Sequence, residues 1–331
     1  MPELRQDPLS GDWVIFAPER GTRPDHLDRP RPEETDPDIC PFCPGHEHLT
    51  PPAILAWKKD GHASSGSDWA VRVFANLYPA LRVEGEVAAR PDGFYDCMNG
   101  IGAHEIVVLT PDHRARPSGL SAGHWRLVLD ACQSRIRDLR GDIRLRHIQL
   151  FLNHGYRGGA TQPHAHAQLL ALPLVPPRVQ QRAQRMQDHF SRRGRCLLCD
   201  IRAVELDEKE RVFMDSGRVT GFVPYAAVHP FTMWLVPATH LARFEDADAA
   251  SLDAMAAALQ ESLAGMDRLL ERPDFQVVIH SAPFHEDGAA WRHWFIEILP
   301  VLSGTGGFEH ATGCRINTVL PEEAATALAG V

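Results

Sequence analysis

The sequence predicts an α+β fold built as a tandem duplication of one unit. Two Cys-x-x-Cys pairs open two series of motifs that run in the same order. Each pair is followed by a proline-led histidine, an amphipathic helix, an apolar strand and a further histidine. The two histidines are 51 residues apart in the first series and 53 in the second. Self-similarity of this kind indicates an internal repeat.

Bulk composition is that of an ordinary globular protein and excludes several classes. At 331 residues, with 44% hydrophobic and 23% charged residues, the chain can form one large or two medium domains. A net charge of −9 gives no basic field for nucleic acid. With no apolar run of about 18 residues and no signal-peptide pattern at the start, we expect a cytoplasmic protein without a membrane span.

The first half reads as strands followed by one long helix. Turn signals surround a first strand, and residues 82–103, which contain four glycines, are expected to be irregular. Apolar residues at helical spacing predict the helix, which a glycine ends at position 141. The expected strands are 13–17, 53–57, 69–75, one starting at 104 and 143–152, and the helix is 120–140.

A glycine-rich stretch from Asn153 to Gln168 carries the residues best suited to chemistry. Glycines at 155, 158 and 159 let the backbone approach a ligand closely. His164, His166 and Gln168 then alternate, so a strand would place all three on one face. An imidazole can attack phosphorus while backbone N–H groups hold the anionic oxygens. An isolated His-x-His is more often a surface pair, but the glycines and the Cys/His pattern favour a phosphate site.

The second half repeats the metal-binding pattern without the nucleophile. A polar helix over 178–195 connects a first half of 1–177 to a second half of 196–331, which contains a helix at 249–270 and a strand at 275–279. The positions of His166 and Gln168 are taken by Phe295 and Glu297. His280 falls near the counterpart of Asn153, though not in the same register. Cys196, Cys199, His240 and His293 form a Cys2His2 candidate that favours structural zinc.

These motifs resemble those of galactose-1-phosphate uridylyltransferases, the transferase branch of the histidine-triad superfamily, from Arg5 to about Glu323. The resemblance implies two histidine-triad-like units, each a mostly antiparallel sheet with helices packed on it. It also implies that His166 becomes uridylylated and that Gln168 hydrogen-bonds the phosphoryl oxygens. A first zinc would be held by Cys40, Cys43, His113 and His164. His104 is the nearest competitor of His113 for that role.

Further expectations follow from the same resemblance. The nucleotide-sugar would contact Arg20, Arg23, Asn76 and Asn153 and the stretch Gly158, Gly159, Ala160 and Thr161. Family members are commonly homodimers. Because no acidic residue follows the nucleophile strand where iron-binding members have a Glu, the second site is expected to hold zinc and not iron.

Three functions remain open from the sequence. The leading hypothesis is exchange of a nucleoside monophosphate between UDP-glucose and a hexose 1-phosphate through a nucleotidyl-histidine. Within it, the segment 306–317 resembles the ADP-glucose phosphorylase subgroup, in which phosphate is the acceptor. A histidine-triad hydrolase is disfavoured by Gln168, which replaces the third histidine. A zinc-knuckle protein that binds nucleic acid is disfavoured by the acidic charge.

Overall fold

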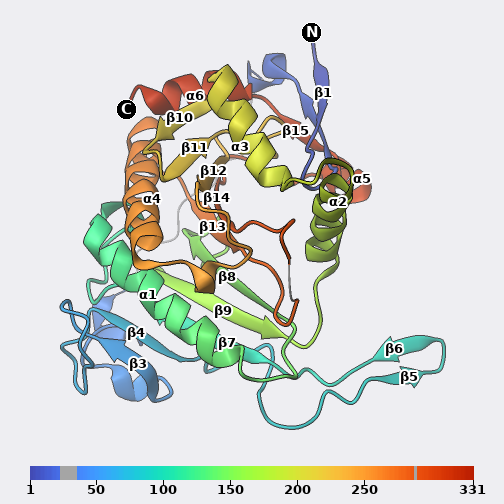
Figure 1. Ribbon diagram of the computed structural model, residues 1–331. Helices are drawn as coiled ribbons and strands as arrows, with labels where there is room; N and C mark the ends of the chain where they lie inside the picture. The colour runs from blue at the N-terminus through green and yellow to red at the C-terminus, as the bar shows by residue number, and fades with distance from the viewer. Residues whose placement is uncertain (23–35, 287–288) are drawn as a thin grey trace.

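The computed structural model describes residues 1–22, 36–286 and 289–331. Its centre is one ten-stranded sheet, in the order β10-β11-β12-β14-β13-β8-β9-β7-β4-β3, and the paired strands are antiparallel (Figure 1). The first half contributes β3 Ala53–Trp57, β4 Val71–Ala75, β7 Ala103–Val108, β8 His147–His154 and β9 His166–Leu172. The second contributes β10 Val212–Asp215, β11 Val219–Phe222, β12 Met233–Pro237, β13 Phe275–His280 and β14 Phe295–Pro300.

The strand order confirms the predicted α+β duplication. From the centre outward, the first half runs β8, β9, β7, β4, β3 and the second runs β13, β14, β12, β11, β10. Gln168 lies opposite Phe151, and Glu297 lies opposite Val278, so these pairs are counterparts. Asn153 lies two residues after Phe151 on β8, and His280 lies two residues after Val278 on β13. Asn153 and His280 are therefore counterparts as well. The expectation that they were out of register is wrong, because the two extra residues of the second copy lie in the loop after His280.

Two long helices cover one face of the sheet and pack against each other (Figure 1). Helix α1, Ala122–Leu139, begins where the Ser121 hydroxyl accepts a hydrogen bond from the His124 N–H. Helix α4, Ala249–Leu269, begins in the same way at Asp248, which accepts from the Ser251 N–H. Side-chain caps of this kind satisfy amides that have no partner inside the helix. The apolar face predicted for the first helix, which includes Trp125, is buried in the main core.

Outside the two repeats, the expected strand 13–17 is present as β2, and several other elements were not predicted. A three-stranded sheet is formed by β1 Glu3–Gln6, β2 Trp13–Phe16 and β15 Arg315–Asn317, with β15 parallel to β2. The remaining helices are α2 Pro177–Arg193, α3 Leu197–Glu208, α5 Gly307–Thr312 and α6 Pro321–Ala329. Only α2 was expected. In the described part of the chain, no helix is long and apolar enough to cross a membrane.

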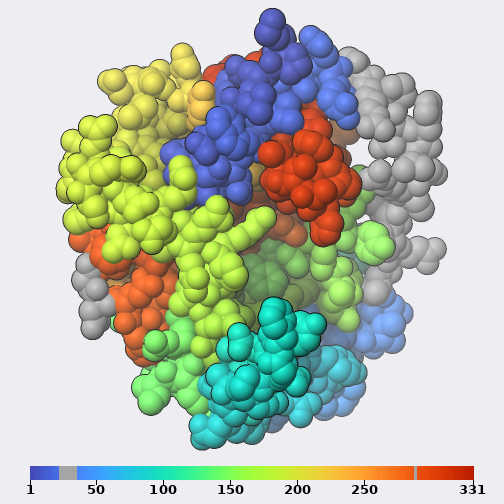
Figure 2. All heavy atoms as spheres, turned by 90° about the vertical axis from the view of Figure 1, so that its right-hand side faces the viewer, coloured from blue at the N-terminus to red at the C-terminus, as the bar shows by residue number. Residues whose placement is uncertain are grey.

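A hairpin replaces part of the expected irregular segment. Strands β5 Arg90–Asp92 and β6 Tyr95–Cys97 pair with each other and project from the body of the molecule (Figure 1). Gly93 makes the turn at a φ of 61°, a value that favours glycine. Phe94 and Tyr95 at the tip are 96% and 74% exposed. Figure 2 shows the side of the molecule that carries this hairpin, with a hollow behind it floored by green atoms from the middle of the chain.

Candidate active site

Four ligand groups converge beside the start of β9. The Sγ atoms of Cys40 and Cys43 and one ring nitrogen each of His113 and His164 all lie within 4.8 Å of one another. The Cys40 and Cys43 sulfurs are 3.6 and 3.7 Å from His164 Nδ1, and Cys43 Sγ is 3.4 Å from His113 Nδ1. Ordinary Zn–S and Zn–N bonds at a tetrahedral ion would separate sulfur and nitrogen by about 3.6 Å. The cluster therefore fits a metal ion.

The protonation of this cluster also suits a cation. His164 Nε2 is 2.7 Å from the carbonyl of Thr110, which can only accept, so Nδ1 carries the lone pair that faces the sulfurs. Burial lowers the pKa of His164 to about 4 and keeps the ring neutral. Burial and the neighbouring Cys40 raise the pKa of Cys43 to about 12. A bound cation would reverse that last shift, because it stabilises thiolate.

A second cluster of the same composition lies in the second half. Cys196, Cys199, His240 and His293 also place their ligand atoms within 4.8 Å of one another. Cys199 Sγ is 3.3 Å from Nδ1 of both histidines. The two clusters can thus each hold a metal ion, and two sulfurs with two imidazoles are a usual ligand set for zinc.

The ring of His166 is held with one nitrogen available. Its Nδ1 is 2.9 Å from the carbonyl oxygen of His164, so Nδ1 carries the proton and donates. The residue is only 4% exposed, and Phe42 packs edge-on against the ring at a centroid distance of 5.3 Å. Among the described residues Nε2 has no hydrogen-bond partner. Burial lowers the pKa of His166, so Nε2 offers a lone pair at neutral pH.

Gln168 lies further along β9 and is hydrogen-bonded to His104. Its Oε1 is 2.8 Å from His104 Nε2, and Asn76 Nδ2 lies 3.3 Å from the same nitrogen. His104, the expected competitor for the first metal, is absent from the described cluster because β7 directs it toward Gln168. The structure thus brings together Asn76, His104 and Gln168 on adjacent strands.

The glycine-rich loop before β9 is braced by the second half of the chain. Gln276 Nε2 donates to the Gly158 carbonyl at 2.9 Å, and Asp274 accepts from the Arg157 N–H at 2.8 Å. A Cβ on Gly158 would lie 2.3 Å from the His154 carbonyl oxygen, so only glycine fits there. Asn153 reaches the loop through a long 3.5 Å contact with the Gly159 carbonyl.

Not all of the expected phosphate contacts are free in this loop. The Gly159 and Ala160 amides donate to the carbonyls of Tyr156 and Gly155, both at 3.1 Å. These two amides are therefore already paired within the loop, and the contact of the stretch 158–161 with a nucleotide-sugar stays a prediction. Thr161 is exposed at the end of the loop.

Of the two arginines expected at the nucleotide, the structure describes Arg20. Arg20 is exposed on the 3-10 helix Pro18–Thr22 and, in the described chain, bonds to none of the other predicted site residues. Arg23 lies outside the described residues.

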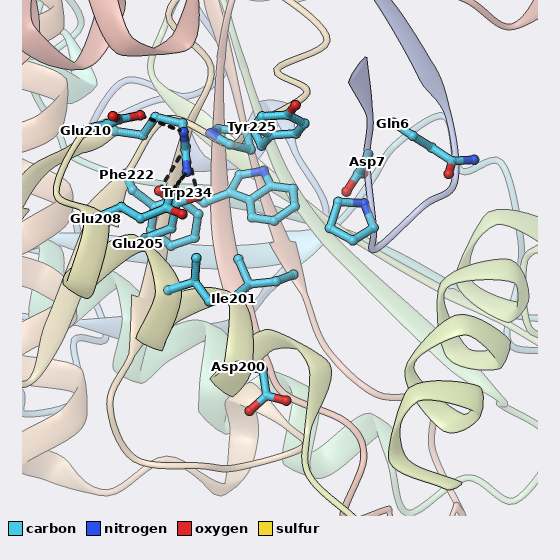
Figure 3. Close-up of a pocket in the computed structure, with 14 residues that line it drawn as sticks. Gln6, Asp7, Asp200, Ile201, Glu205, Glu208, Glu210, Phe222, Tyr225 and Trp234 are labelled. Carbon is cyan, nitrogen blue, oxygen red and sulfur yellow. Dashed lines mark hydrogen bonds and ion pairs between the residues drawn. The ribbon is translucent and has the colours of Figure 1, made fainter. Parts of the chain in front are cut away.

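A large cavity lies elsewhere, between α3 and strands β11 and β12 (Figure 3). It encloses about 770 Å³ over the aromatic rings of Phe222 and Trp234. Carboxylates of Glu205, Glu208 and Glu210 line it, and Arg211 is paired with the first two at 3.0 and 2.5 Å. This acidic wall is unsuited to phosphate, so size alone does not identify the reaction site.

Comparison with known proteins agrees with this geometry. A family profile described as the galactose-1-phosphate uridyl transferase N-terminal domain matches residues 1–176, and the corresponding C-terminal profile matches 182–305. The chain belongs to the galactose-1-phosphate uridylyltransferase family. As a member of this family it is an enzyme, a nucleotidyltransferase.

Two relatives and one crystal structure are similar to this chain over almost its whole length. ADP-glucose phosphorylase of Arabidopsis thaliana is 34% identical over 98% of this chain and 91% of its own. Galactose-1-phosphate uridylyltransferase of Thermotoga maritima is 26% identical over 99% and 98%. A crystal structure of the Arabidopsis phosphorylase with bound ADP-glucose matches with a TM-score of 0.86 at 33% identity, covering 100% of this chain and 99% of that one.

Sequence reasoning about this transferase missed three contributors to the site. Phe42, inside the first Cys-x-x-Cys, packs against both His164 and His166. Gln276 on β13 and Asp274 directly before this strand form hydrogen bonds to the glycine-rich loop. No local pattern identifies these two, because their partners lie more than a hundred positions earlier in the chain.

Proposed function

We propose that the protein is a phosphorylase that transfers AMP from ADP-glucose to phosphate through a covalent adenylyl-His166. The main structural support is the fixed tautomer of His166, which leaves a neutral Nε2 open beside Gln168 and the glycine loop. An imidazole is nucleophilic near pH 7 and becomes a good leaving group once it is bonded to phosphorus.

The reaction runs as two displacements at the same phosphorus. In the first, His166 Nε2 bonds to the α-phosphorus of ADP-glucose, the bond to the bridging oxygen breaks, and glucose 1-phosphate leaves with that electron pair. In the second, an oxygen of inorganic phosphate bonds to the α-phosphorus, the P–N bond breaks, and ADP leaves. No external base is required, since the departing and entering groups are phosphate oxygens.

The other residues have supporting roles in this scheme. Gln168 and the amides of Gly158 and Thr161 would donate hydrogen bonds to oxygens on the transferred phosphorus. Cys40, Cys43, His113 and His164 would hold one Zn²⁺, and the second cluster another. A bound ion would supply a rigid anchor for His164, whose carbonyl oxygen accepts the Nδ1 proton of His166 and so holds that ring in place.

The choice of nucleotide rests on the relatives. The sequence first suggested UDP-glucose and galactose 1-phosphate, the substrates implied by the family as a whole. The higher identity to ADP-glucose phosphorylase, 34% against 26% for the T. maritima uridylyltransferase, and the match to a crystal structure with bound ADP-glucose favour adenine and phosphate. UDP-glucose uridylyltransferase activity is the second candidate, supported by relatives such as that of T. maritima.

Partial exchange tests the covalent step directly. ¹⁴C-glucose 1-phosphate should enter ADP-glucose in the absence of phosphate, because the first displacement is reversible. ADP-glucose labelled on the adenosine phosphate should leave acid-labile label on the protein, and His166→Ala should abolish it. His62→Ala is the matched control, since that side chain is 82% exposed on a surface loop. Running UDP-glucose in parallel decides the nucleotide. Absence of exchange with both donors would reject the mechanism, and rapid release of free AMP would indicate a hydrolase.

We also propose that the chain divides into a catalytic half (1–177), a connector (178–195) and a second half (196–331), and that it forms a homodimer. Support for the dimer comes from the projecting hairpin, whose aromatic tip, Phe94 and Tyr95, is exposed to solvent. Exposed aromatic pairs of this kind are frequent at protein interfaces. Sedimentation of the wild type should give twice the monomer mass, and Phe94→Ser with Tyr95→Ser should reduce it.

A further inference from the structure

The backbone contact of the His104 ring favours one tautomer. Its Nδ1 lies 3.2 Å from the backbone N–H of Ala80, which can only donate. Nδ1 therefore carries a lone pair, and the ring proton must be on Nε2. Asn76 Nδ2, 3.3 Å from the same nitrogen, is a donor and makes no hydrogen bond to a protonated Nε2, so the tautomer rests on the Ala80 contact and on the shorter contact with Gln168.

The proton on His104 fixes the amide of Gln168. The Nε2–H donates to Gln168 Oε1 at 2.8 Å. The reversed amide would bring two N–H donors together at that distance, so it is excluded. Gln168 thus has its carbonyl oxygen engaged and its NH2 group directed away from His104.

The second copy contains the same arrangement at the counterpart position. Arg182 Nη1 donates to His280 Nδ1 at 2.6 Å, and His280 Nε2 donates to Glu297 Oε2 at 2.8 Å. Glu297 is the counterpart of Gln168 on the duplicated strand. In both halves a donor sets the tautomer of a histidine, and the histidine then donates a hydrogen bond to the side chain at the Gln168 or Glu297 position. The two histidines come from different strands, β7 and β13, so the arrangement is not copied residue for residue.

We propose that His104 is a positioning residue that turns the Gln168 amide so that only N–H donors face the transferred phosphoryl group. The inference rests on the proposed nucleotidyl transfer. Without His104 the amide can rotate, and its carbonyl oxygen can face the anionic oxygens, which is repulsive. The loss corresponds to about one hydrogen bond, or roughly a tenfold fall in kcat.

A double-mutant cycle on ADP-glucose phosphorolysis separates positioning from packing. His104→Leu should lower kcat roughly tenfold with little change in KM, and His104→Gln should restore most of it, since its amide N–H can donate to the same oxygen. In a Gln168→Ala background, His104→Leu should have no further effect. Equal losses in both backgrounds, or failure of His104→Gln to restore kcat, would overturn the proposal. Thermal unfolding and metal content of each variant identify any that fail to fold.

A second measurement does not depend on activity. Nitrogen-15 NMR of the wild-type imidazoles should show His104 with its proton on Nε2. The side-chain amide resonances of Gln168 should move in His104→Leu and return toward wild type in His104→Gln. A proton on Nδ1 would overturn the proposal even if phosphorolysis is rapid. Conversely, an inactive wild type with the expected tautomer would reject the proposed function alone.

Discussion

The two copies of the repeat have the same strands, but they differ in whether the polar groups at corresponding positions are hydrogen-bonded to other protein groups. In the first copy, His166 keeps one ring nitrogen without a described partner, and Gln168 directs its NH2 group away from its only described partner. In the second, Phe295 replaces His166 and stacks on His280 at 4.4 Å. Glu297, which replaces Gln168, accepts hydrogen bonds from His280 and from Trp234 Nε1 at 3.0 Å.

This difference shows how a duplicated site can change from chemistry to packing. Both copies keep a Cys2His2 cluster at the same place on the sheet. The second copy has lost the hydrogen-bonding groups that a ligand could use. Its buried Glu297 is fully paired with protein groups, which stabilises the fold but leaves no group for a ligand. The following predictions test this contrast, from the largest expected effect to the smallest.

Substitutions at the nucleophile position should have different effects in the two copies. His166→Ala should reduce nucleotidyl transfer by on the order of 10⁴-fold, because the covalent route is lost. Phe295→His should create no second labelled position, because the carboxylate of Glu297 repels a nucleotide phosphate. Mass spectrometry of protein incubated with ADP-glucose counts the adenylyl groups. Two groups per chain in Phe295→His would show that the second copy retains a usable site.

Removing one metal ligand from each cluster should separate activity from stability. Cys43→Ser should lose the first metal and roughly 100-fold in kcat, because His164 no longer fixes its neighbour. Cys199→Ser should lose the second metal and lower Tm while kcat changes much less. Elemental analysis gives the metal content of each variant. An equal loss of kcat in both would mean that the second cluster also supports the reaction.

Adding a Cβ at Gly158 should lower kcat more than it lowers the stability of the fold. In Gly158→Ala the new Cβ would lie 2.3 Å from the His154 carbonyl and 2.8 Å from that of Phe275, so the loop must move. We expect kcat to fall by roughly tenfold or more, since a shift of about 1 Å misplaces the phosphoryl contacts. Gly123→Ala is the control, because nothing lies within 4 Å of a Cβ there. Unchanged kcat in Gly158→Ala would place the loop outside the reaction.

Neutralising Glu297 should alter the pH dependence of stability and leave the reaction nearly unchanged. Burial alone would raise the pKa of Glu297, but the hydrogen bond from His280 and the charge of Arg182 hold it at about 2. Its stabilising contribution is therefore present above the unfolded pKa of about 4.3 and is lost as the pH falls toward 2. At pH 7, Glu297→Gln should be less stable by about 1–3 kcal/mol, because one donor loses its acceptor.

Urea unfolding at several pH values measures this contribution. The difference in unfolding free energy between wild type and Glu297→Gln should shrink between about pH 4.3 and pH 2. A difference that stays constant through this range would show that the Glu297 carboxylate is not stabilised in the folded protein. Wild-type kcat in the variant would agree with a role in packing only.

Much of the fold and the site could be predicted because the signals are local. The spacing of the Cys/His motifs predicted the duplication, and helical periodicity predicted α1 and α4 within two residues at either end. Helix α3 was missed because its first turn overlaps the metal motif Cys196 to Cys199, which hides the helical pattern.

Long-range contacts set the limit of the sequence analysis. Whether His280 and Asn153 are counterparts depends on strand pairing, which counting along the chain did not reveal. The role of His104 depends on Ala80 and Gln168, which lie 24 and 64 positions away. The use of the Gly159 and Ala160 amides within the loop follows from a turn geometry that a glycine-rich sequence does not specify.

The pairing of β8 with β13 has a consequence for how the chain arose. Phe151 lies opposite Val278, its own counterpart, so the contact between the copies is two-fold symmetric. Two identical separate chains would meet through such an isologous edge. The central join of the sheet thus has the geometry of an ancestral dimer fused into one polypeptide. In a dimer of identical subunits any substitution appears on both sides, whereas fusion allowed one side to retain a reactive histidine and the other to lose it.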